Sequence, residues 1–141
     1  MAAMGTLYLV RHGQASFGAA DYDHLSDLGR RQCLELGRWF RARDVVFEGV
    51  MHGTLRRHEQ SLAALAEGHG ELPAARPWPG LNEYDGDALV RAVYPARQPP
   101  ADVSAPEGYR THFRLLREGL ASWIAGRTVP AGMPSWPDFV A

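Results

Sequence analysis

The sequence contains no lysine, only one cysteine (Cys33) and no long hydrophobic run. A membrane-spanning helix needs about 20 consecutive apolar residues, and the most apolar opening stretch, residues 7–10, is too short even for the core of a signal peptide. One cysteine excludes an internal disulfide framework and a cysteine-based zinc site, so we expect a protein of the reducing cytoplasm. The formal net charge of -1 argues against broad nucleic-acid binding.

The composition is otherwise that of a globular protein. The 141 residues fit one compact domain, and 45% of them are hydrophobic while 22% are charged. All 15 basic residues are arginine. The planar guanidinium group suits phosphate and carboxylate groups, so the arginine-only composition, together with six histidines, favours a site for an anion.

The distribution of apolar residues predicts alternating strands and helices. Residues 6–10 form an apolar run of strand-forming residues, which predicts a buried strand covered on both faces. Two further strands are expected, over residues 45–51 with an interruption at Gly49, and over residues 76–78. Helices are expected over residues 26–42, 55–67, 87–94 and 108–125. This order predicts an α/β fold with a mainly parallel sheet.

Helix starts and helix faces follow from residue types and spacing. Ser26 and Thr54 are expected to cap the first two helices. The second helix is predicted to bury Leu55, His58, Leu62 and Leu65, and the helix over 108–125 to bury Tyr109, Phe113, Leu116, Leu120 and Trp123. Ser135, with Pro137 and Asp138 after it, predicts the start of another helix. Because the sequence stops soon afterwards, we expect a truncated chain.

Polar residues follow each of the three predicted strands. They are residues 11–13, residues 52–57 and Glu83, and the carboxyl ends of parallel strands are where ligands bind. A histidine between arginines is held neutral and is therefore nucleophilic, and a phosphoryl group is its natural target beside two guanidinium groups. The guanidinium groups would bind the phosphoryl oxygens, and Glu83 would protonate the leaving oxygen.

Four segments resemble the histidine phosphatase superfamily, the phosphoglycerate mutase-like proteins. Residues 9–14, Leu-Val-Arg-His-Gly-Gln, are similar to its signature, and residues 25–32 to its Leu-Thr/Ser-x-x-Gly-x-x-Gln stretch. Residues 53–61 resemble its Ser-Pro-Leu-x-Arg-Ala-x-Gln-Thr stretch, and residues 81–83 its Leu-x-Glu. The segments occur in the family's order and spacing.

The resemblance implies a fold, a reaction and a set of site residues. The fold is a three-layer α/β/α domain with a mainly parallel sheet, formed by residues 1–141 as a single domain without its C-terminal strands. His12 would accept the phosphoryl group as a phosphohistidine, with Arg11 and Arg57 holding the phosphate and Glu83 as proton donor. The residues expected to bind substrate are Gly13, Gln14, Ser16 and His52. No metal and no organic cofactor is implied.

The sequence also departs from the family pattern. Gly53-Thr54 replaces Ser-Pro, His58 replaces a small Ala, and Gly18 stands where many members have an Asn that contacts phosphate. The family has a second pocket histidine late in the chain, whereas no histidine follows Phe113 here. Among the other histidines, His52 is the first candidate for that role. His58 and His112 are expected in the packing, His24 in a loop and His69 on the surface.

Three functions remain open from the sequence. The first is a phosphomonoester hydrolase acting through phosphohistidine. The second is a mutase, for which the proline-rich residues 95–106 would act as a lid that excludes water. The third is a non-catalytic phosphate-binding protein. The expected ligand is a small phosphorylated metabolite or a phosphorylated side chain, with neither nucleic acid nor membrane as a partner.

Overall fold

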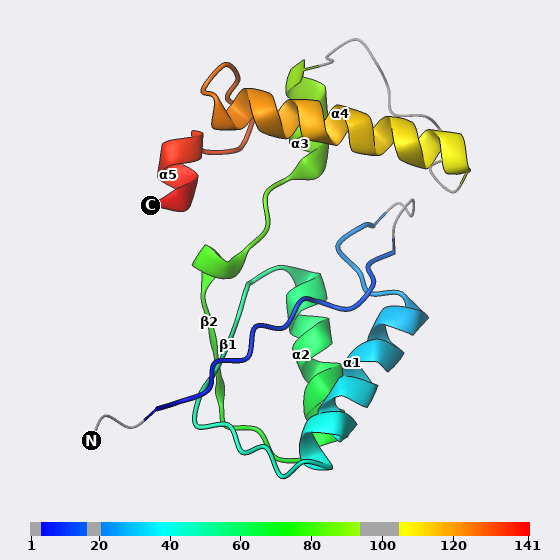
Figure 1. Ribbon diagram of the computed structural model, residues 1–141, viewed down its shortest axis with the longest axis vertical. Helices are drawn as coiled ribbons and strands as arrows, with labels where there is room; N and C mark the ends of the chain where they lie inside the picture. The colour runs from blue at the N-terminus through cyan, green and yellow to red at the C-terminus, as the bar shows by residue number, and fades with distance from the viewer. Residues whose placement is uncertain (1–3, 17–20, 94–104) are drawn as a thin grey trace. The chain divides into compact units, whose positions relative to one another are not determined.

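The computed structural model describes residues 4–16, 21–93 and 105–141 (Figure 1). Gly18 and most of the predicted lid lie outside these residues. The chain divides into two compact units, Met1–Asn82 and Glu83–Ala141. The first contains α1 (Asp27–Arg41), β1 (Val50–His52), α2 (Arg56–His69), β2 (Ala75–Pro77) and the 3-10 turn η1 (Pro79–Leu81). The second contains α3 (Gly86–Val93), α4 (Pro106–Ile124) and α5 (Trp136–Val140).

Helix α1 begins where the sequence predicts. The Ser26 hydroxyl accepts a hydrogen bond from the backbone N–H of Gly29 at 3.0 Å, which satisfies one of the N–H groups that a helix start leaves without a helical acceptor. Such a cap stabilises a helix by about 1 kcal/mol. Asp27 in the first turn and Arg38 and Arg41 in the last turn also have the charges that the helix dipole favours.

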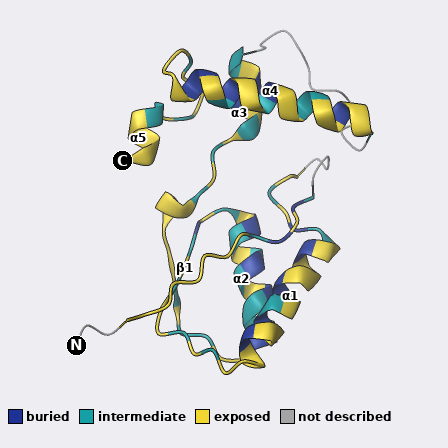
Figure 2. Cartoon of the chain, in the orientation of Figure 1, coloured by how far each residue is buried: buried dark blue, intermediate teal, exposed yellow. Residues whose placement is uncertain are grey.

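Helices α1 and α2 pack side by side through glycines (Figures 1 and 2). A β-carbon added at Gly37 of α1 would overlap the carbonyl group of Leu65, and one added at Gly68 of α2 would overlap that of Leu34. The two backbones therefore touch at both places, which only glycine permits. This close approach fixes how the C-terminal halves of α1 and α2 lie relative to each other.

The buried side of α2 differs from the predicted side. Its buried residues are Arg57, Ser61, Ala64, Gly68 and His69, whereas the predicted residues Leu55, His58, Leu62 and Leu65 are only half-buried. A close helix crossing selects small residues, so the apolar pattern is a poor guide here. The predicted Thr54 cap is also wrong. Leu55 takes the N-cap position and makes no side-chain cap.

Strands β1 and β2 form a parallel pair on either side of α2 in the sequence. Val50 pairs with Ala75 and His52 with Pro77. This strand, helix, strand unit confirms the predicted α/β class and the parallel pairing. Residues 45–47, predicted as part of the first of these strands, lie outside it.

The buried strand predicted over residues 6–10 is absent. Leu7 and Leu9 are 82% and 88% exposed, and no segment within residues 4–16, 21–93 and 105–141 forms a strand pair with residues 6–10. A strand needs the backbone groups of a neighbour, and an apolar run cannot supply them by itself. Tyr8 contacts the first unit from this segment, with its ring edge-on to Phe40 at 5.1 Å and to Phe47 at 5.7 Å between centroids.

The second unit is built around Trp123 of α4. This side chain is fully buried, contacts Trp136 and Phe139 of α5, and donates a hydrogen bond from Nε1 to the carbonyl oxygen of Pro134 at 3.0 Å. Ser135 caps α5 as predicted, because its hydroxyl accepts from the backbone N–H of Asp138. The residues that α4 buries are Gly108, Leu115, Gly119, Ser122 and Trp123.

Two residues predicted to face inward on α4 face solvent instead. Tyr109 and Phe113 are 48% and 43% exposed, and their rings contact each other at 4.7 Å between centroids. Helix α3 packs against α4 so closely that a β-carbon at Gly119 would lie 2.7 Å from the carbonyl oxygen of Leu89. This backbone contact turns the Gly119 side of α4 inward. None of the helices in the described part of the chain is long and apolar enough to span a membrane.

Candidate active site

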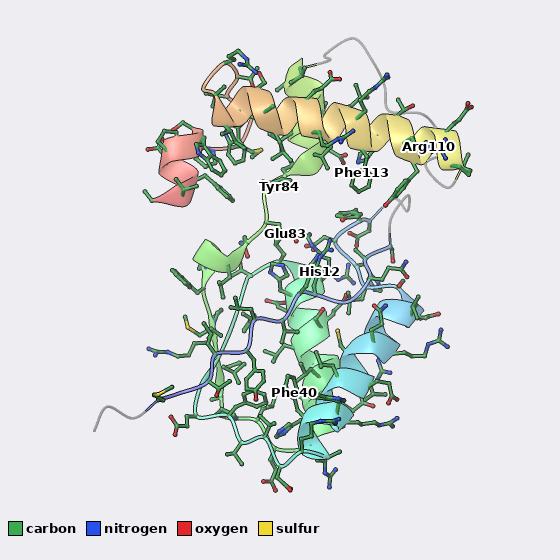
Figure 3. The ribbon with its side chains drawn as sticks, viewed as in Figure 1. His12, Phe40, Glu83, Tyr84, Arg110 and Phe113 are labelled. Atoms are coloured by element: carbon green, nitrogen blue, oxygen red, sulfur yellow. The ribbon has the colours of Figure 1, made fainter. Side chains whose placement is uncertain are left out.

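His12 (Figure 3) follows the exposed N-terminal segment and is held by its own neighbour, Gly13. Its Nδ1 lies 2.6 Å from the carbonyl oxygen of Gly13, and the imidazole is half-buried. A carbonyl oxygen only accepts hydrogen bonds, so Nδ1 carries the proton and the lone pair of the neutral ring is at Nε2. The contact therefore selects the tautomer in which Nε2 is the unprotonated nitrogen.

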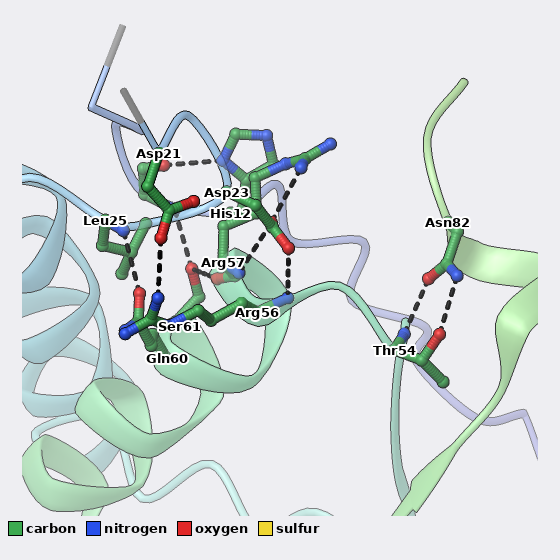
Figure 4. A network of polar contacts seen from close by, with 11 residues as sticks. His12, Asp21, Asp23, Leu25, Thr54, Arg56, Arg57, Gln60, Ser61 and Asn82 are labelled. Carbon is green, nitrogen blue, oxygen red and sulfur yellow. Dashed lines mark hydrogen bonds and ion pairs between the residues drawn. The ribbon is translucent and has the colours of Figure 1, made fainter. Parts of the chain in front are cut away.

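The backbone of Gly13 ties His12 to both helices of the first unit. Its N–H donates to the hydroxyl of Ser61 at 3.0 Å, and that hydroxyl donates to the carbonyl oxygen of Arg57 at 2.7 Å (Figure 4). A β-carbon at Gly13 would overlap the backbone of Gly29 in α1, so the close approach requires glycine here. The position of the imidazole is thus set by the packing of α1 and α2.

Arg57 is the buried cation of this region. Its side chain lies at the start of α2, the residue is 6% exposed, and its Nη1 pairs with Oδ1 of Asp23 at 2.9 Å. The Tyr22 ring also lies near the guanidinium, 5.5 Å from centroid to Cζ. A buried charge is stable only when it is paired and hydrogen-bonded, and Asp23 supplies that partner.

Asp23 also caps the N-terminus of α2, although it lies in the loop before α1. Its carboxylate accepts hydrogen bonds from the backbone N–H groups of Arg57 at 3.1 Å and Arg56 at 2.9 Å. Partial burial acts to raise the pKa of the Asp23 carboxyl, but these backbone bonds and the Arg57 guanidinium outweigh it and hold the pKa below its ordinary value. Asp23 is therefore the cap that Thr54 was expected to provide.

Further contacts fix the loop that carries Asp23. Arg56 pairs with Asp21 at 2.7 Å, and the backbone N–H of Leu25 donates to Oε1 of Gln60 at 2.8 Å. Leu25 also forms an antiparallel bridge with Ala15. Together these contacts bind the segment before α1 to the first two turns of α2 (Figure 4).

His58 is the histidine beside His12. The two ring centroids are 5.8 Å apart and the ring planes are tilted by 36°. His58 also fills the space over Gly53, where a β-carbon would overlap its Nδ1. His52, the first candidate from the sequence, is half-buried and has its Nδ1 2.8 Å from the carbonyl oxygen of Gly53.

The remaining histidines have separate environments. His69, predicted on the surface, is buried, with Nε2 2.8 Å from the carbonyl oxygen of Val45. His24 is exposed and bonds through Nδ1 to the carbonyl oxygen of Leu25. His112 is half-buried on α4 in the second unit.

The structure brings some of the predicted site residues together. His12, Gly13 and Arg57 are joined through Ser61, as described above. Gln14 is exposed and its side chain accepts from the Ser26 hydroxyl at 3.1 Å, while Ser16 donates its backbone N–H to the carbonyl oxygen of His24. Arg11 is exposed, and Glu83 is the exposed first residue of the second unit. The roles predicted for these residues stay predictions.

Sequence reasoning missed Asp23 and Ser61. Asp23 lies 34 residues before Arg57, and Ser61 lies 48 residues after Gly13, so no local pattern links the partners. The one available signal is the sequence of residues 53–61, where Ser61 belongs to the segment that resembles the superfamily. Within the described residues, no group of three or more side chains could hold a metal ion.

The comparison with known families identifies a superfamily. A model of the histidine phosphatase superfamily (branch 1) matches residues 7–100, which is more than half of the chain. The chain therefore belongs to the histidine phosphatase superfamily. Searches of curated proteins and of solved structures gave no match.

Proposed function

We propose that the protein is a phosphomonoester hydrolase that acts through a phosphohistidine on His12. One observation carries the proposal. The His12 ring is fixed by Gly13 in the tautomer whose Nε2 is nucleophilic, and the same loop is tied through Ser61 to the turn that holds the buried Arg57. A fixed neutral imidazole beside a buried guanidinium suits transfer of an anionic phosphoryl group.

In the first step, Nε2 of His12 attacks phosphorus and the bond from phosphorus to the ester oxygen breaks. The leaving oxygen takes a proton from the Glu83 carboxylic acid, which becomes a carboxylate. In the second step, water attacks phosphorus, its proton returns to Glu83, and the bond to Nε2 breaks. The products are the alcohol and inorganic phosphate, and both side chains recover their starting forms.

The arginines supply charge to the transferring group. Arg57 and Arg11 would bind the phosphoryl oxygens, because guanidinium groups match their geometry and offset the negative charge. Gly13, Gln14, Ser16 and His52 would line the substrate side of the site. Only Arg57 of these side chains is buried and held by a carboxylate, so it is the principal phosphate-binding group in the proposal.

The substrate we propose is a small phosphorylated metabolite or a phosphorylated side chain in the cytoplasm. The near-zero net charge and the single cysteine support this choice over a nucleic acid or a secreted partner. We also propose the three-layer α/β/α plan for the domain. The parallel pair of β1 and β2, with α1 packed on α2, supports part of that plan.

Hydrolysis of an aryl phosphate by the chain and by His12→Ala tests the proposal. His24→Ala is the matched control, because His24 has the same Nδ1 contact to the next carbonyl oxygen but is exposed. We expect hydrolysis that His12→Ala abolishes and His24→Ala retains, with folding verified by circular dichroism. Binding of phosphate without turnover would instead support a binding protein, and a phosphohistidine that resists water would support a mutase.

A further inference from the structure

We infer that His58 is a second catalytic histidine, which contacts the phosphoryl group carried by His12. The inference rests on the proposed function and adds a residue to its site. His58 follows Arg57 directly in the first turn of α2 and is half-buried. Its ring centroid is 5.8 Å from that of His12, so a phosphoryl group on His12 lies within reach of the neighbouring imidazole.

Gly53 is what gives the His58 ring its place. A β-carbon at position 53 would overlap Nδ1 of His58 and would lie 2.8 Å from its Cε1 and 2.6 Å from Oδ1 of Asn82. Any side chain at position 53 therefore displaces the ring from this position. The glycine and the histidine form a coupled pair in the structure.

The coupled pair also explains two departures in the sequence. The superfamily pattern has Ser and Ala at positions 53 and 58, and this chain has Gly and His. Compared with that pattern, position 53 in the loop after β1 has lost its side chain, and position 58 in the first turn of α2 has a larger one. Because the added volume is an imidazole beside the nucleophile, the exchange adds a polar group to the site and not only a packing contact.

The His58 ring has a second nitrogen that can donate a hydrogen bond to phosphate. Nδ1 and Cε1 of His58 are its ring atoms nearest to position 53, and Nε2 is the second ring nitrogen, bonded to Cε1 on the side away from Nδ1. An Nε2–H donor there would bind a phosphoryl oxygen through a charge-assisted hydrogen bond. His58 makes no covalent bond in this proposal. It binds the phosphoryl group and stabilises its charge during transfer.

Two substitutions separate this role from packing. His58→Phe keeps an aromatic ring over Gly53 but removes the donor, whereas His58→Gln keeps an N–H donor. Binding of inorganic phosphate, measured by titration calorimetry, is the readout. We expect His58→Phe to weaken phosphate binding about tenfold, the loss of one charge-assisted hydrogen bond. We expect His58→Gln to stay close to the wild type, and His24→Phe, an exposed control, to leave the affinity unchanged.

Wild-type affinity in His58→Phe would overturn the inference, as would a wild-type chain that does not bind phosphate. If His58→Phe does not fold, His58→Ala is used in its place. We then expect added free imidazole to restore the phosphate affinity of His58→Ala, because imidazole supplies the lost donor. Absence of that rescue would overturn the inference. Failure of the proposed function is seen separately, as aryl phosphate hydrolysis that does not depend on His12.

Discussion

Asp23 holds Arg57 by two bonds to the same carboxylate oxygen. Oδ1 accepts the Arg57 backbone N–H at 3.1 Å and pairs with Nη1 of its guanidinium at 2.9 Å. One carboxylate thus fixes both the start of α2 and the side chain that it presents. Because Arg57 is buried, its guanidinium keeps this geometry before any ligand binds.

The planar guanidinium group of Arg57 is expected to be needed for phosphate binding. Arg57→Lys retains the charge but loses the planar donors. We therefore expect kcat/KM for an aryl phosphate to fall about 10- to 100-fold, which corresponds to the loss of one to two charge-assisted hydrogen bonds. Arg56→Lys is the matched control, since the neighbouring Arg56 is exposed and pairs with Asp21. Equal losses in the two variants would contradict the assignment to Arg57.

The Asp23 carboxylate is expected to make the free energy of unfolding depend on pH. Its pKa is lower in the folded chain than in the unfolded chain, so it stabilises the fold above the unfolded pKa of about 4 and loses this effect as the pH falls through the folded pKa. Urea unfolding at neutral pH and near pH 3 measures the effect. We expect Asp23→Asn to remove part of the loss of stability on acidification. An identical pH dependence of the unfolding free energy in wild type and variant would contradict the stabilising contribution assigned to Asp23.

Ser61 is expected to be a positioning residue for His12. Ser61→Ala leaves the buried N–H of Gly13 without its hydroxyl acceptor, which costs about 1–3 kcal/mol in unfolding free energy. The loop that carries His12 loosens as well, so kcat for an aryl phosphate is expected to fall more than KM rises. The control is Ser122→Ala. Ser122 is also a buried serine, but it lies in α4 of the second unit. A kcat unchanged in Ser61→Ala would show that this bond does not position the histidine.

The glycine contact between α1 and α2 is expected to control stability. Alanine favours a helix by about 1 kcal/mol over glycine, but the β-carbon of Gly68→Ala would overlap the Leu34 carbonyl group, and overpacking costs about 1–3 kcal/mol. We therefore expect a lower denaturation midpoint for Gly68→Ala. Gly49→Ala serves as control, because its β-carbon has open space. A higher midpoint in Gly68→Ala would mean that helix propensity exceeds the clash.

Local signals in the sequence predict the helices well. Ser26 and Ser135 cap α1 and α5 as predicted, and α3 and α4 lie close to their expected ranges. Caps and helical spacing depend on neighbouring residues, so the sequence contains the information. The Arg11-His12-Gly13 segment predicts His12 as the nucleophile, and that role stays a prediction.

Contacts between distant segments are not predicted. Arg57 pairs with Asp23 and Ser61 accepts from Gly13, and these partners lie 34 and 48 residues away in the sequence. Residues 6–10 show the same limit, because their apolar pattern does not supply the neighbouring strand that would bury them. The role of Gly53 likewise appears only when the His58 ring is placed over it.

Detection of the phosphohistidine tests the central claim most directly. The chain is mixed with an aryl phosphate, quenched in alkali to preserve a phosphohistidine, and examined by intact-mass and peptide mass spectrometry. We expect one added phosphoryl group on the peptide that contains His12, and none in His12→Ala. A phosphoryl group on another residue, or hydrolysis that proceeds in His12→Ala, would contradict the account.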